Sequence, residues 1–193
     1  MRIMTIYAQA SDETRKNLDR APKEMKAGIK DAVNELTKES REDILKTSRQ
    51  KYTLRKGRFR KSDISLKKAV LTRLEATLSI SGETEPINKA YRFRKNSVRK
   101  GVRAEIKRGN GLKELKMRSG SLKAFVTGVT TGHADKVHKD VFQRKGKERL
   151  PIKTIQGPSR AKIAEVLWRD EMQSTKGEEL IRRINALAER TLS

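Results

Sequence analysis

The stretch VLTRLEATLSI, residues 70–80, alternates apolar and polar side chains with a period of two. Successive side chains of a β-strand point to opposite faces of the sheet, so this period is typical of a half-buried strand. We therefore expect a sheet in the middle of the chain. The side chains expected on its inner face are Val70, Thr72, Leu74, Ala76, Leu78 and Ile80.

A second alternation follows at Val98, Val102, Ala104 and Ile106. Gly109-Asn110-Gly111 comes next and supplies residues that accept positive φ, which indicates a hairpin. Residues 124–130, 137–144 and 150–155 are further strand candidates, separated by glycines. Short turns between strands favour antiparallel pairing.

Both ends of the chain have the period of helices. Ser11 followed by two acidic residues predicts a helix start, and Pro22 a restart or kink. A helix over 22–47 would be about 39 Å long at about 1.5 Å per residue, too long for a small core to cover. We expect part of it to meet another subunit. Its apolar stripe consists of Met25, Ile29, Val33, Leu36 and Ile44.

The C-terminal part is expected to form two helices separated at Gly177. Pro158 and Ser159 should open the first, because proline is favoured in a first helical turn. Its apolar face contains Ile163, Val166, Leu167 and Trp168. The face of the last helix contains Leu180, Ile181, Ile184, Leu187 and Ala188.

These elements predict the α+β class, with a long N-terminal helix, a central and mainly antiparallel sheet, and C-terminal helices. The expected segments are a helical arm over 1–48, a basic β-rich core with a loop over 49–157, and helices over 158–193, together forming one domain. Apolar residues make up 34% and charged residues 37% of the chain, so we expect a modest core and contacts between subunits.

The sequence offers little chemistry for catalysis. It has no cysteine, and its two histidines, His133 and His138, have no partner at metal-ligand spacing. Phosphate-binding, dinucleotide-binding and nucleophile-elbow motifs are lacking, and no apolar run approaches the length of a membrane span. We expect a soluble chain that is not an enzyme and has no cofactor and no metal.

The net charge of +23 is concentrated in the middle of the chain. Residues 1–48 hold 10 Lys and Arg against 9 Asp and Glu, and residues 158–193 hold 7 against 6. Residues 49–157 hold 30 against 9. This segregation predicts an anionic neighbour, and the candidate contacts are Arg55, Lys56, Arg58, Arg60, Lys61, Arg92, Arg94 and Lys95.

Two interpretations of these basic tracts stay open. Tyr52, Phe59, Tyr91 and Phe93 are interleaved with the basic residues, as in proteins that hold nucleic acid by phosphate contacts and base stacking. Alternatively, the aromatic side chains point inward and the charges serve solubility or an acidic protein. The first tract, around Gly57, has almost no apolar pattern and is expected to be a loop.

The most specific motif is HADKVHKDVFQRKGKERLPIKTIQGPS, residues 133–159, preceded by Gly132. It resembles the C-terminal hallmark of the phage minor tail protein Z family. The matching residues are Gly132, His133, Val141, Phe142, Arg144, Gly146, Arg149, Leu150, Pro151, Ile152, Gly157, Pro158 and Ser159. Without the family, the same residues describe an antiparallel hairpin whose exit is redirected into a helix.

The resemblance implies a structural virion protein of a tailed phage or prophage. Such a minor tail or tail completion protein would sit at the head-proximal end of the tail, after assembly in the host cytoplasm. We expect a homo-oligomeric ring around the DNA channel, a hexamer by analogy with tail symmetry, in contact with other tail or neck proteins and with genomic DNA. The alternatives are a sequence-independent nucleic-acid-binding protein and, third, a DNA-processing enzyme.

Overall fold

The computed structural model describes residues 2–7, 21–95, 101–115, 123–130, 137–144, 146, 148 and 150–192. The chain divides into two compact units. Unit 1 comprises residues 1–47, 60–83 and 160–193, and unit 2 comprises residues 48–59 and 84–159. Residues 60–83 therefore group with the helices, although the sequence placed them in the basic β-rich segment.

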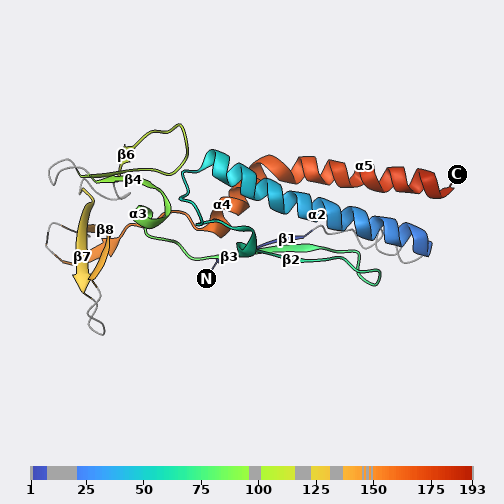
Figure 1. The fold of residues 1–193 in the computed structure, drawn as a ribbon, viewed down its shortest axis with the longest axis horizontal. Coiled ribbons are helices and arrows are strands. Elements are labelled where there is room, and N and C mark those ends of the chain that lie inside the picture. The colour runs from blue at the N-terminus through green and yellow to red at the C-terminus, as the bar shows by residue number, and fades with distance from the viewer. Residues whose placement is uncertain are drawn as a thin grey trace. The chain divides into compact units, whose positions relative to one another are not determined.

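Unit 1 contains a three-stranded antiparallel sheet (Figure 1). Its strands are β1 (Arg2–Tyr7), β2 (Ile64–Lys67) and β3 (Thr77–Gly82), in the order β1-β3-β2. Ile6 and Leu66 both pair with Leu78 of the central strand. Leu78 and Ile80 are buried, as the period of two predicted.

The first half of the predicted strand over 70–80 is wrong. Val70 and Arg73 exchange backbone hydrogen bonds of 2.9 Å in a tight turn, and Val70 is 48% exposed. The chain reverses direction here, between β2 and β3. The alternation of apolar and polar residues extends into this turn, and the pattern alone does not distinguish the turn from a strand.

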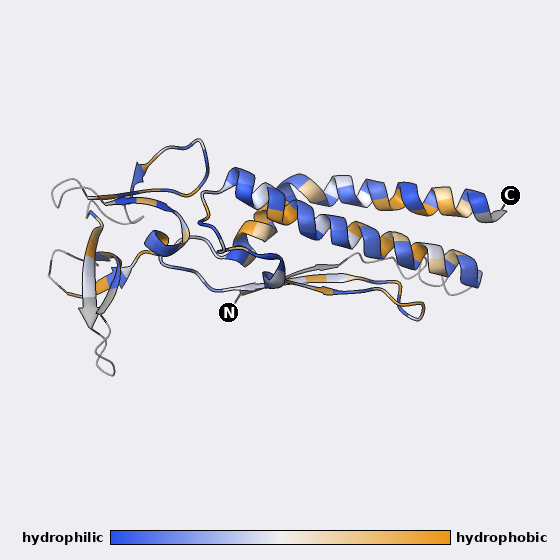
Figure 2. Ribbon diagram, in the orientation of Figure 1, coloured by the Kyte–Doolittle hydropathy of each residue, from blue (hydrophilic) through white to orange (hydrophobic). Residues whose placement is uncertain are grey.

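Helix α2 (Lys23–Lys51) confirms the predicted long N-terminal helix. Its apolar residues Ile29 and Val33 form a core with Ala69 and Ala76, against which Met25, Leu74, Leu180, Ile184 and Leu187 pack. The last three belong to α5 (Gln173–Leu192), which lies antiparallel beside α2. Figure 2 shows hydrophobic bands along both helices.

The two predicted C-terminal helices are one continuous helical run. Helix α4 (Arg160–Leu167) passes through a π-helical turn (Trp168–Met172) into α5, and Gly177 lies inside α5. The prediction that Gly177 ends or breaks a helix is thus wrong. Glycine costs a helix interior only about 1 kcal/mol, so a single glycine does not have to end a helix that packs against α2 through Leu180, Ile184 and Leu187.

The apolar face of α4 also differs from the prediction. Ile163 and Leu167 are each 1% exposed, whereas Val166 and Trp168 are only half-buried. Pro158 precedes the helix by two residues instead of lying in its first turn.

Unit 2 contains two antiparallel three-stranded sheets and the short helix α3 (Ile87–Ala90). The first sheet is β4 (Arg92–Lys95), β5 (Val102–Glu105) and β6 (Lys113–Glu114), with β5 in the centre. The second is β7 (Phe125–Thr130), β8 (Val137–Arg144) and β9 (Ile152–Thr154), with β8 in the centre. The predicted α+β class is confirmed, with three small sheets in place of one.

The turn between β5 and β6 has the predicted conformation. Gly109 and Gly111 have φ angles of 83° and 66°, a region that residues with a Cβ rarely adopt. In the described part of the chain, no helix has the length and apolarity needed to cross a membrane. Predictions for Ser11, Val98, Gly132, His133 and Arg149 lie outside the described residues, as does the side chain of His138.

Candidate nucleic-acid interface

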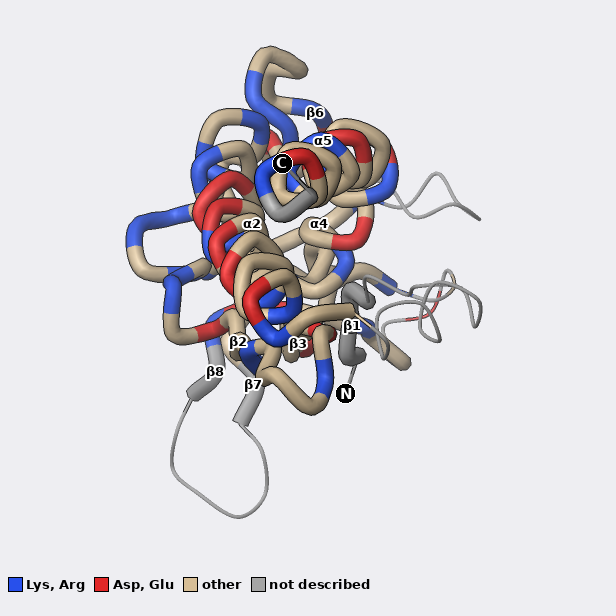
Figure 3. Tube along the Cα trace, turned by 90° about the vertical axis from the view of Figure 1, so that its right-hand side faces the viewer, with Lys and Arg blue, Asp and Glu red and all other residues tan. Residues whose placement is uncertain are grey.

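The excess positive charge belongs almost entirely to unit 2. The sequence of unit 2 contains 25 Lys and Arg against 6 Asp and Glu, a balance of +19, whereas unit 1 contains 22 against 18, a balance of +4. Figure 3 shows acidic and basic bands alternating along α2 and mostly basic bands on the loop before β6. Unit 2 is therefore the part of the chain whose electrostatic field would attract an anion.

Three of the four aromatic residues of the basic tracts are buried and not available for stacking on bases. Tyr52 is 5%, Phe59 3% and Tyr91 0% exposed, and Phe93 is half-buried. The inward orientation that we considered as the alternative therefore describes the first three. Any contact of this surface with nucleic acid would depend on charge.

Several basic residues of the first tract are engaged within their own unit. Arg58 forms an ion pair of 2.9 Å with Glu85, and the Nε of Arg55 donates a 3.2 Å hydrogen bond to the carbonyl of Tyr91. Lys61, in unit 1, pairs with Glu42 at 2.9 Å and lowers the pKa of that carboxyl. Arg55 and Arg58 therefore fix the loop over 53–59.

The first tract is a loop with a turn at Gly57, as predicted, but it has an apolar anchor. Phe59 lies between Arg58 and Arg60 and is buried. Its burial agrees with the inward orientation considered for the four aromatic residues, although a single buried side chain in a loop has no periodic neighbours to indicate it. Lys56 and Arg60 are exposed, and Lys56 makes no ion pair within the described part of the chain.

The second tract is organised by the buried carboxylate of Glu105. Its Oε2 accepts a 2.9 Å hydrogen bond from Arg92, and its Oε1 accepts one of 3.1 Å from the backbone N–H of Gly109. The hydroxyl of Thr53 donates to the Glu105 carbonyl. One carboxylate thus joins β4 to the glycine turn and neutralises Arg92, a role that sequence patterns did not indicate.

Arg94 is placed differently from Arg92. It lies on β4 directly opposite Arg103 of β5, and both side chains are exposed. Side chains directly opposite each other in an antiparallel pair share a face, and like charges there are destabilising. The sequence indicated that Arg103 points outward, but not which residue it faces. The side chain of Lys95 is outside the described residues.

Two residues of the motif, Gly157 and Pro158, contact Tyr91. Gly157 is buried, and a Cβ on it would lie 2.7 Å from the Cδ2 of Tyr91, inside the ring's contact surface. The Tyr91 hydroxyl donates a 2.5 Å hydrogen bond to the Pro158 carbonyl. Burial, reinforced by Tyr52 and Glu85, raises the pKa of the Tyr91 phenol far above its usual range.

The other described motif residues divide into buried and exposed groups. Val141 and Phe142 of β8 and Ser159 are buried, and Ile152 of β9 is half-buried. Arg144 lies over the ring of Phe125, 5.9 Å from its centroid. Gly146, Leu150 and Pro151 are exposed. The motif is therefore architectural where the structure describes it.

Neither the known protein families, nor the curated proteins, nor the solved structures contain a match to this chain. The resemblance to the minor tail protein Z family therefore rests on the motif alone.

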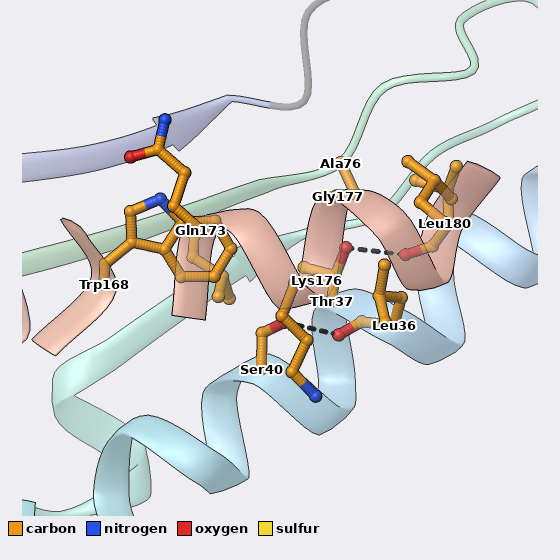
Figure 4. A pocket seen from close by; sticks show the side chains of 11 residues that line it. Leu36, Thr37, Ser40, Ala76, Trp168, Gln173, Lys176, Gly177 and Leu180 are labelled. Atoms are coloured by element: carbon orange, nitrogen blue, oxygen red, sulfur yellow. Dashed lines mark hydrogen bonds between the residues drawn. The ribbon is translucent and has the colours of Figure 1, made fainter. Parts of the chain in front are cut away.

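Unit 1 contains a cavity of about 170 Å³ between α2, β3 and α5 (Figure 4). Leu36, Leu78 and Leu180 supply much of its apolar lining, and Trp168 lies at one end. Two of its polar side chains have partners: the Ser40 hydroxyl donates to the Leu36 carbonyl at 2.7 Å, and Lys176 pairs with Asp43 at 2.6 Å. The cavity thus offers apolar contact rather than a reaction centre.

Among the described residues, no group of three or more His, Asp and Glu side chains is placed to share a metal ion. The arrangement that remains as a candidate site is the basic outer face of unit 2.

Proposed function

We propose that this chain is a structural virion protein of a tailed phage or prophage, a minor tail or tail completion protein at the head-proximal end of the tail. In this proposal, copies of the chain form a homo-oligomeric ring around the DNA channel, expected to be hexameric, and contact other tail or neck proteins. The chain acts by shape and charge, not as an enzyme.

The observation that carries the proposal is the division of charge between the two units, together with the tail-protein motif of residues 132–159. Unit 2 has a balance of +19 and contains that motif, whereas unit 1 has a balance of +4. A ring around DNA needs one surface that tolerates a dense polyanion and another that contacts protein neighbours. A nearly neutral helical unit and a strongly basic unit suit these two tasks.

The decisive experiment is to locate the chain in assembled particles. Purified virions are imaged with an epitope tag on the chain, and the ring is extracted for mass measurement. We expect density at the junction of head and tail, and a mass that is a small multiple of one chain, six by analogy. Absence from virions, or isolated monomers only at the junction, would overturn the proposal.

A sequence-independent nucleic-acid-binding protein outside any virion is the second candidate, favoured by the same charge on unit 2. Such a protein would bind duplex DNA tightly as a free chain, with a steep salt dependence, and would be found on cellular nucleic acid. The location experiment separates the two, because only the virion protein is incorporated into particles.

A further inference from the structure

We infer that the outward face of the β4-β5-β6 sheet, centred on Arg94 and Arg103, binds the phosphate backbone of duplex DNA. This inference rests on the proposed function, in which the chain surrounds DNA, and it assigns that contact to one face of unit 2. The candidates named from sequence were spread over both basic tracts and did not include Arg103.

The register of the sheet determines which side chains share a face. Arg94 pairs directly with Arg103, so their side chains leave the sheet on the same face, with Cβ atoms about 4.5–5.5 Å apart by the usual spacing of such pairs. Both are exposed, and neither forms an ion pair within the described residues. Glu114 of β6 lies directly opposite Arg103 on its other side but forms no ion pair with it. The like charges of Arg94 and Arg103 lower the stability of the sheet, and a bound anion would remove that cost.

Other arginines of the two basic tracts already have partners within unit 2. Arg92, on the same face, is paired with Glu105, whose second oxygen holds the Gly109 N–H. In the first tract Arg58 is paired with Glu85, and Arg55 is bonded to a backbone carbonyl. Arg94 and Arg103 therefore combine exposure, proximity and unpaired charge.

A pair of neighbouring guanidinium groups favours phosphate as the bound anion. Guanidinium groups bind phosphate oxygens with paired N–H donors, and two of them side by side match successive phosphates of one strand. The exposed turn at Lys107, Gly109 and Gly111 adds cationic and small residues near the end of β5. No exposed aromatic or base-reading helix accompanies them in the described part of unit 2, so the contact should be independent of sequence.

The test measures binding of the purified full-length chain to a fluorescent 30-base-pair duplex at a series of salt concentrations. Wild type is compared with the double variant Arg94→Gln/Arg103→Gln. Each phosphate contact contributes about −0.9 to the slope of log K against log salt. Loss of two contacts should therefore make the slope less negative by about 1.8. A second duplex of unrelated sequence should give the same slopes.

The matched control is Arg73→Gln/Arg190→Gln, which removes two exposed arginines from unit 1 and gives the same net charge. It should leave the slope unchanged. The charge-preserving variant Arg94→Lys/Arg103→Lys should retain most of the wild-type slope. Thermal unfolding of the Gln double variant should show equal or higher stability than wild type, since a like-charge pair has been removed.

Equal slopes for wild type and the Gln double variant would overturn the inference, as would a wild-type chain that does not bind duplex DNA but binds an acidic polypeptide. Neither result bears on the location of the chain in virions. Conversely, a chain that binds DNA through these arginines but is absent from virions would overturn the proposed function and leave the DNA contact standing.

Discussion

The Cα of Gly157 lies against the ring of Tyr91, whose hydroxyl donates a hydrogen bond to the carbonyl of the next residue, Pro158. The N–H of Gly157 in turn donates a 3.0 Å hydrogen bond to the carbonyl of Glu85. The Gly-Pro-Ser element thus packs against, and accepts a hydrogen bond from, a buried tyrosine located more than sixty residues earlier in the chain. A side chain at position 157 would therefore overlap the ring of Tyr91.

Gly157→Ala should destabilise unit 2 strongly. The new methyl group would enter the ring of Tyr91, and overpacking of this kind costs about 1–3 kcal/mol, or more where the neighbour cannot move. Urea unfolding followed by circular dichroism measures the loss. The control is Gly146→Ala, where a methyl group meets nothing within 4 Å and should change stability by less than about 0.5 kcal/mol. Equal effects at the two positions would contradict this role of Gly157.

Tyr91→Phe should make the protein less sensitive to alkaline pH. The unfolded phenol loses its proton near pH 10, whereas the buried phenol keeps it to a higher pH, since burial raises its pKa. The unfolded state thus binds fewer protons above about pH 10, and stability falls as pH rises. Below about pH 10 the stability that arises from the raised pKa of Tyr91 is fully present.

The test is to measure the unfolding midpoints of wild type and Tyr91→Phe from pH 8 to 11. Lysine titration affects both proteins alike, so a difference between their pH dependences reports on Tyr91. The wild-type midpoint should decline more steeply than that of Tyr91→Phe. At pH 8 the variant should be less stable by about 1 kcal/mol, the usual net value of a lost hydrogen bond. Parallel declines would show that Tyr91 is not the titrating group.

Gly177→Ala should stabilise the protein by about 0.5–1 kcal/mol, because alanine is the better residue in a helix interior. Position 177 lies inside α5, and a methyl group there meets no atom within 4 Å. Thermal unfolding measures the gain. A loss of stability would mean that α5 is interrupted at Gly177, as the sequence alone had suggested.

Leu167→Ala should cost more stability than Trp168→Ala. Leu167 is 1% exposed, and truncating such a residue costs about 2–5 kcal/mol. Trp168 is larger but only half-buried at the end of the cavity, so its removal leaves fewer atoms without partners. The free energies of unfolding of the two variants, measured by chemical denaturation, show which truncation costs more stability. The larger loss at Trp168 would restore it as the main anchor of the C-terminal helices.

Periodic elements were predictable and the partners of individual residues were not. Helix α2 and strands β7 and β8 follow from their patterns, because each buries a regular face over several turns or alternations. Strand β2 and helix α3 are four residues each, too short for a period to develop. At Val70 the error was the reverse: the alternation predicted a strand where the structure has a turn, and the side chain is exposed.

The candidate site was predictable in location and charge but not in detail. Counting charges placed the basic surface in the middle of the chain. That Glu105 neutralises Arg92, and that Arg94 faces Arg103, depends on the register of β4 against β5. Sequence patterns do not indicate this register, although a shift of one residue would move every side chain to the other face.

The division of the chain into units also affects the order in which it can fold. Unit 1 is assembled from three separate segments, and its core joins Ile29 and Val33 near one end to Leu180 and Leu187 near the other. During synthesis, the apolar stripe of α2 therefore leaves the ribosome long before its partners on α5 exist, and contacts so distant in sequence close slowly. Most of unit 2 is continuous, from residue 84 to residue 159, and can form in that interval. A nascent chain halted before α5 would expose the α2 stripe to chaperones or to aggregation while its basic unit was already formed.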